Sequence, residues 1–128
     1  MEKIASFQQL NAWQEAHKLV LRVYRITKMY PDTERYGLVS QMRRAAVSIA
    51  ANIAEGFKRR GLQEKVHFYN ISEGSLEEIK YFFILSKDLD YLSSNVEELE
   101  QAETVGRLLN GLIASTQRRK TSSPPPTP

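Results

Sequence analysis

Apolar residues recur at helical spacing in four separate stretches of this chain. The stretches run from Ser6 to Pro31, from Tyr36 to Arg60, from Leu62 to Leu89 and from Ser94 to Arg118. Side chains three or four residues apart share one face of a helix, so each stretch predicts an amphipathic helix. No stretch shows the alternation and hairpin signals of strands. Long helices with short connections predict an all-α protein, an antiparallel up-and-down four-helix bundle. We assign residues 1–119 to the bundle and residues 120–128 to a disordered, proline-rich tail.

The second stretch is apolar on more than one side. At about 100° per residue, one arc collects the expected core residues Leu38, Met42, Ala45, Ala46, Ile49, Ile53 and Phe57. A second arc is polar and contains Arg44 and Glu55. The remaining side carries only small apolar residues, namely Val47, Ala50, Ala51 and Ala54. Small side chains let another helix approach closely, so these four residues predict an oligomer interface. Alternatively, the alanines simply favour helix on an unoccupied surface.

Local signals predict two helix starts and one close contact between helices. Two pairs fit a capping box, in which side chains satisfy the backbone N–H groups at a helix start: Ser6 with Gln9, and Ser94 with Glu97. The pentapeptide Asn-Ile-x-Glu-Gly occurs twice, ending at Gly56 and at Gly74. A glycine inside a helix costs about 1 kcal/mol relative to alanine. We therefore expect close helix packing at Gly74 to compensate that cost.

The composition excludes several kinds of chemistry. The 128 residues, 41% of them hydrophobic and 26% charged, are typical of one soluble domain. The chain has no cysteine, its two histidines lie outside metal-binding spacings, and no phosphate-binding glycine loop or catalytic triad is identifiable. We therefore expect a non-enzymatic protein with no metal and no cofactor. Neither a signal-peptide pattern nor a membrane-spanning apolar run is evident, so we expect a cytoplasmic protein.

Charge is distributed unevenly along the chain. The segment from Gly61 to Glu103 holds three basic and ten acidic residues. The second predicted helix instead carries five basic residues, which are Arg43, Arg44, Lys58, Arg59 and Arg60. Because the arginine fork can donate two hydrogen bonds to one phosphate, these five residues are candidates for binding nucleic acid. The same asymmetry also fits subunits that pair a basic face with an acidic face.

Several segments of the chain resemble one bacterial protein family. They are Phe7-x-x-Leu10-x-x-Trp13, Glu34–Ile49, Asn52–Gly56, Phe68–Ile71, Gly74–Glu78 and Asp88–Leu92. Together they resemble the four-helix bundle family of 23S rRNA intervening-sequence proteins over roughly residues 4–115. Glu73 departs from the family pattern, which tends to have a neutral or basic residue there. The family is also similar to the accessory proteins of diversity-generating retroelements.

The resemblance implies a binding protein and not an enzyme. By analogy with the retroelement accessory proteins, it implies a homo-oligomer, a pentameric ring, that binds RNA or an RNA-handling protein such as a reverse transcriptase. The alternative hypothesis is a protein–protein interaction scaffold whose basic and acidic faces serve ring assembly only. In that case Arg43 and Arg44 face a neighbouring subunit and not a ligand.

Overall fold

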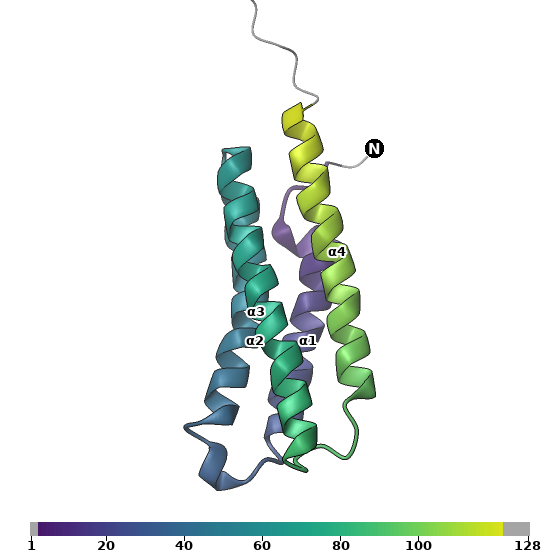
Figure 1. The fold of residues 1–128 in the computed structure, drawn as a ribbon. Coiled ribbons are helices and arrows are strands. Elements are labelled where there is room, and N and C mark those ends of the chain that lie inside the picture. Colours follow the sequence, from purple (N-terminus) through teal and green to yellow (C-terminus); the bar gives the residue numbers. More distant parts are fainter. Residues whose placement is uncertain (1–2, 122–128) are drawn as a thin grey trace, which may run out of the picture.

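The computed structural model describes residues 3–121, which form four long α-helices and two short 3-10 turns. The helices are α1 (Asn11–Thr27), α2 (Leu38–Lys58), α3 (Leu62–Asp88) and α4 (Val96–Thr121), and the turns are η1 (Phe7–Gln9) and η2 (Asp32–Glu34). Successive helices run in opposite directions (Figure 1), and the described residues contain no strand. The predicted all-α, up-and-down four-helix bundle is therefore confirmed. Of the predicted tail, residues 120 and 121 belong to α4, and residues 122–128 lie outside the described residues.

The packing order decides which helix ends lie together. Both α2 and α4 pack against α1 and α3, so α2 and α4 lie diagonally across the bundle. The upper end of the molecule in Figure 1 gathers the last turns of α2 and α4 with the first turn of α3. Residues near 60 and residues near 118 therefore share one end of the bundle, although they are far apart in the sequence.

The core confirms the predicted stripe of α2. Six of its seven residues are buried and Phe57 is partly buried. Large side chains from the other helices fill the space between them, including Leu19, Val23, Tyr69, Ile79, Phe83, Val105 and Leu109. The buried Ser72 hydroxyl donates a hydrogen bond to the carbonyl oxygen of Ile49 at 2.8 Å. A small polar residue is tolerated in this core because its hydroxyl is satisfied by the neighbouring helix.

The first capping box is present but encloses a shorter element than predicted. The Ser6 hydroxyl accepts from the N–H of Gln8 at 3.2 Å, and the Gln9 side chain accepts from the N–H of Ser6 at 3.0 Å. They close the 3-10 turn η1, and Leu10 then leaves the helical region with φ −74° and ψ 127°. The extended residue Leu10 buries its side chain in the core, so α1 begins at Asn11 and not at Ser6.

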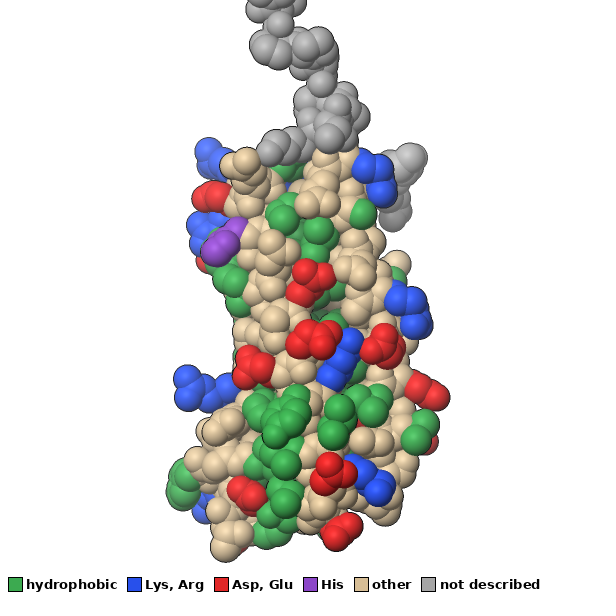
Figure 2. Space-filling view, viewed as in Figure 1, with side chains coloured by type: hydrophobic (Ala, Val, Ile, Leu, Met, Phe, Trp, Pro, Cys, Tyr) green, Lys and Arg blue, Asp and Glu red, His purple; other side chains and the backbone are tan. Residues whose placement is uncertain are grey.

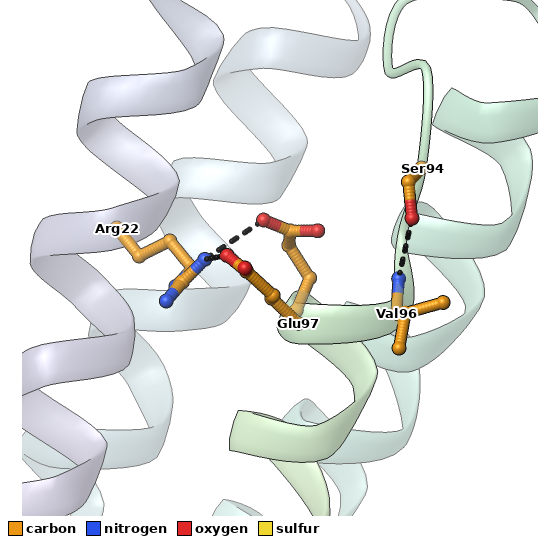
Figure 3. Close-up of polar contacts among 5 residues, drawn as sticks. Arg22, Ser94, Val96 and Glu97 are labelled. Atoms are coloured by element: carbon orange, nitrogen blue, oxygen red, sulfur yellow. Dashed lines mark hydrogen bonds and ion pairs between the residues drawn. The ribbon is translucent and has the colours of Figure 1, made fainter.

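The second capping box does not form. The Ser94 hydroxyl accepts from the N–H of Val96 at 3.3 Å, as predicted for a cap, but the Glu97 side chain is turned toward α1 (Figure 3). There its Oε2 lies 3.5 Å from Nη1 of Arg22, whose same nitrogen also donates to Oε2 of Glu98 at 2.9 Å. The carboxylates at the start of α4 therefore fasten this helix to α1. An arginine on a neighbouring helix was not visible in the local sequence pattern.

The close contact expected at Gly74 is also absent. A Cβ atom placed on Gly74 would meet nothing within 4 Å, and the residue is exposed. The prediction of compensating helix packing within this chain is therefore wrong for Gly74. Gly74 instead lies on the outer surface of α3, on the side opposite the buried residues Ser72 and Leu76.

Candidate nucleic-acid interface

The five basic residues predicted to bind nucleic acid lie in two separate places. Lys58 is the last residue of α2, and Arg59 and Arg60 follow it directly. Arg44 precedes Lys58 by fourteen residues in the same helix, which is about 20 Å along the axis at a rise of about 1.5 Å per residue. A single small ligand cannot contact both groups. The two groups are therefore separate candidate sites.

The fold adds further cations to the group at the end of α2. Burial lowers the pKa of Lys65, in the first turn of α3, and the positive charge of Arg119 lowers it further. Arg119 in α4 therefore lies close enough to Lys65 for the two charges to repel each other. We call this cluster the basic end; its members are Lys58, Arg59, Arg60, Lys65, Arg118 and Arg119. Figure 2 shows Lys and Arg side chains at both upper corners of the molecule.

Three members of the basic end come from outside the predicted set. Lys65, Arg118 and Arg119 were not among the candidate residues. A signal was present, because the chain from Thr104 onward has basic residues and no acidic ones. In an up-and-down bundle the last turns of the second and fourth helices lie at the same end. Combining topology with charge would have placed Arg118 and Arg119 at this end, whereas the proximity of Arg119 to Lys65 comes only from the structure.

The cations of the basic end differ in whether they already bind other groups of the chain. The Lys65 ammonium donates to the carbonyl oxygens of Phe57 at 2.6 Å and Gly56 at 3.4 Å, which closes the last turn of α2. Arg59 pairs with Glu55, and its guanidinium lies 4.7 Å from the ring centroid of Phe68. In contrast, Lys58 and Arg60 are exposed and form no hydrogen bond or ion pair with the described residues. Those two charges are open to an external anion.

The second group, Arg43 and Arg44, lies in the second turn of α2, beside the last turn of α1. Arg43 ties α2 to α1, because its Nε donates to the Thr27 hydroxyl at 3.0 Å and its Nη2 to the carbonyl oxygen of Tyr24 at 3.5 Å. Its guanidinium also covers the Tyr24 ring at 4.6 Å from the centroid. Arg44 is exposed and makes no such bond within residues 3–121. Of these two arginines, Arg44 is the one whose guanidinium has no partner among the described residues.

The predicted oligomer interface is only partly on the surface. Val47 and Ala51 are exposed and Ala54 is partly exposed. Ala50 is only 8% exposed and belongs to the core of its own chain. Its assignment to an external surface was wrong, because Ala50 shares a helix face with the buried residues Ala46 and Ile53. The exposed apolar strip of α2 is therefore narrower than predicted and consists of Val47, Ala51 and Ala54.

Acidic and apolar side chains occupy the side of the bundle formed by α3 and α4. Lys80 bridges the two helices by bonding to Glu77 at 3.0 Å and to Glu103 at 2.9 Å. The hydrogen bond with Lys80 lowers the pKa of Glu103, and the same bond raises the pKa of Lys80. Figure 2 shows carboxylates across the middle of this side and hydrophobic side chains below them. Tyr81 and Ile84 are among the exposed apolar residues of α3.

Neither a metal-binding group of side chains nor a membrane-spanning helix is present in the described part of the chain. Among residues 3–121, no three histidine, aspartate or glutamate side chains are grouped as a metal ion would require. His17 instead stacks on Trp13 with ring centroids 5.0 Å apart, and His67 contacts Phe68 edge-on at 5.4 Å. None of the helices in this part of the chain combines the length and apolarity needed to cross a bilayer.

Comparison with known proteins finds one family. Residues 8–111 match the family model of the 23S rRNA-intervening sequence protein. The match covers α1, α2 and α3 completely and α4 as far as Gly111. It includes both groups of predicted basic residues and ends before Arg118 and Arg119. No curated protein matches the chain.

Proposed function

Because the chain belongs to the family of 23S rRNA-intervening sequence proteins, we propose that it binds structured RNA through the basic end of its bundle. The role is one of binding and not of catalysis. The observation that carries the proposal is the convergence of cations from the last turn of α2, the first turn of α3 and the last turns of α4. The name of the family supports a connection with ribosomal RNA and leaves the bound sequence open.

Electrostatics explains why this end would favour a polyanion. Among the described residues, the cations of the basic end outnumber the nearby carboxylates, Glu55 and Glu64, and Glu55 is already paired with Arg59. The lowered pKa of Lys65 reflects in part the repulsion from Arg119. A phosphate placed between such cations relieves their repulsion, and neutralised phosphates release counterions from the RNA. Folded RNA presents closely spaced phosphates, so several cations at one end of the bundle can be neutralised together.

The test measures how a labelled RNA hairpin binds at several salt concentrations, by fluorescence anisotropy. We expect wild-type affinity to fall steeply with salt. Lys58→Glu/Arg60→Glu should weaken binding strongly, and its salt slope should be smaller by up to about two. Both residues are exposed and unpaired within the described chain, so the bundle should remain folded.

The matched control is Lys87→Glu/Arg107→Glu, which makes the same change in net charge at exposed positions of α3 and α4. The control variant should bind almost as well as wild type. Equal weakening by both variants would assign the effect to net charge and contradict a site at the basic end. Absence of binding at low salt would contradict RNA binding altogether.

A second candidate function, self-assembly, is favoured by exposed apolar residues on two different sides of the bundle. One side presents Tyr81 and Ile84 of α3, and the other presents Val47 and Ala51 of α2. Contact between two unlike surfaces of identical subunits is heterologous, and it closes into a ring when the rotation permits. The resemblance to retroelement accessory proteins leads us to propose a pentamer, with a reverse transcriptase as its RNA-handling partner.

Self-assembly is tested by measuring mass with size-exclusion chromatography and light scattering. Ala51→Glu and Tyr81→Glu should each give monomers, because each buries a charge in one of the two unlike surfaces. An equimolar mixture of the two variants should form dimers, since one intact pair of surfaces remains between them. A monomeric wild type, or variants with the wild-type mass, would contradict this interface.

A further inference from the structure

A groove of about 760 Å³ lies between α1 and α2, away from the basic end. Its lining includes the aromatic residues Tyr24 and Tyr36 and the arginines Arg35, Arg43 and Arg44, and it includes no carboxylate. Aromatic rings that alternate with fixed positive charges are the two components of sites for unpaired nucleic acid: bases stack on the rings and phosphates pair with the cations. Neither component alone points to a ligand, but here both line one groove.

The two tyrosine rings are presented differently. Tyr36, in the turn that leads into α2, is 89% exposed and has no ring contact with the described residues. Tyr24 is 39% exposed, and the Arg43 guanidinium lies 4.6 Å from its ring centroid. The groove therefore already contains one planar cation stacked on a ring and leaves a second ring open. A nucleotide base is planar and can stack on the open ring in the same way.

The arginines of the groove are placed to bind the phosphates of a nucleic-acid backbone. Arg43 is held by Thr27 at 3.0 Å, so its position is fixed before any ligand arrives. Arg44 is exposed and unpaired within residues 3–121. Arg35 contacts Asp32 at 3.4 Å, but both side chains are largely exposed. Exposed pairs of this kind contribute little, so a phosphate can replace the carboxylate.

From these contacts we propose that the groove binds unpaired RNA nucleotides, with a base stacked on Tyr36 and phosphates at Arg44 and Arg35. The proposal rests on the RNA-binding function proposed above and adds a second site that selects single strands. In a duplex the bases are stacked on each other and their faces are hidden, so only unpaired RNA offers both a base face and phosphates. A second copy of this chain is the competing occupant. Two carboxylates on its acidic side, Glu77 and Glu103, are already paired with Lys80, whereas a nucleotide brings both an unpaired phosphate and a free base face.

The experiment compares two probes, a single-stranded oligouridylate and a blunt RNA duplex with the same number of phosphates. Tyr36→Ala should weaken binding of the single strand about fivefold or more, the range expected for loss of one stacked base. It should leave binding of the duplex unchanged. Tyr36→Phe keeps the ring and should bind both probes like wild type. Because Tyr36 is exposed, neither substitution should disturb the fold.

A second pair of variants tests the phosphate contact. Arg44→Glu should weaken the single strand more than the duplex, whereas Arg107→Glu, the control on α4, should affect neither probe selectively. Unchanged single-strand binding in Tyr36→Ala would overturn the proposal. So would a change of oligomer mass in that variant, because it would assign the groove to a subunit contact. If wild type binds the duplex but not the single strand, only this inference fails; if it binds neither, the proposed RNA-binding function fails as well.

Discussion

Gly56 of α2 lies directly against the ring of Tyr69 of α3: a Cβ atom on Gly56 would be 2.6 Å from Cε1 of that ring. The same Cβ would be 3.1 Å from the carbonyl oxygen of Lys65. Tyr69 is only 1% exposed, so its ring is enclosed by the core. The α2–α3 hairpin therefore depends on the absence of a side chain at residue 56.

Gly56→Ala should lower the free energy of unfolding by about 1–3 kcal/mol, the usual cost of overpacking a core. This loss should exceed the gain of about 1 kcal/mol that alanine brings to a helix interior. Urea denaturation followed by circular dichroism measures the difference. A variant as stable as wild type would show that the two helices separate at little cost.

Gly74→Ala should have the opposite sign, although Gly74 ends the same pentapeptide. A Cβ there enters open space on the outside of α3. Alanine should therefore raise the free energy of unfolding by about 0.5–1 kcal/mol through backbone entropy. The same denaturation experiment serves as the measurement. Destabilisation together with a smaller oligomer mass would instead indicate that another subunit packs on Gly74.

The Lys80–Glu103 bridge makes stability depend on pH in a predictable direction. The pKa of Glu103 is lowered in the folded state, so its contribution is present above the unfolded value, near 4.5, and is lost as pH falls through the folded value. The pKa of Lys80 is raised above 10.5, so its contribution is lost only as pH rises through that higher value. Glu103→Gln should therefore be less stable than wild type at neutral pH, and the difference should disappear in acid.

The comparison requires unfolding curves of both proteins from neutral pH to about pH 3, a range that passes below the pKa of an ordinary carboxyl group. Glu100→Gln provides the control, because Glu100 is exposed and unpaired within the described chain. A difference between Glu103→Gln and wild type that persists in acid would show that the side chain contributes by packing and not by charge.

Arg22 and Glu98 form the least exposed ion pair between α1 and α4 that the structure describes, with side chains 23% and 10% exposed. Arg22→Met should lower the free energy of unfolding by about 1.5–3 kcal/mol, since it leaves the Glu98 carboxylate without its charged partner. Glu97→Gln, which alters an 80% exposed carboxylate at 3.5 Å from Arg22, should change stability by less than about 0.5 kcal/mol. Equal effects of the two substitutions in urea denaturation would contradict the dominance of Glu98.

The helices and the core stripe were predictable because they depend on spacing within one segment. Met42, Ile49 and Ile53 lie on the buried face of α2 as their period requires. The start of α1 at Asn11 and the failed capping box at Ser94 were not predictable. Both depend on partners outside the segment: the core that accepts Leu10 and the arginine of α1 that attracts Glu97.

The candidate site residues likewise include some that the local sequence identified and others that it did not. Arg44, Lys58 and Arg60 were identified from charge alone, and the structure leaves these three exposed and without partners among the described residues. Arg119 could not be grouped with Lys58 and Arg60 from charge alone, because this grouping depends on which helix ends lie together. Tyr36 was missed because nothing in the local pattern distinguishes an exposed tyrosine from one that packs against the core.

Periodicity and composition were sufficient for the number of helices, their buried faces and the uneven distribution of charge. These properties follow from the covalent geometry of a helix and from the preference of apolar groups to leave water. The tertiary structure alone distinguished Gly56 from Gly74, withdrew Ala50 from the surface and gathered the basic end from three helices. Such relationships depend on distances between segments that are remote in the chain, and identical local sequences can meet quite different neighbours.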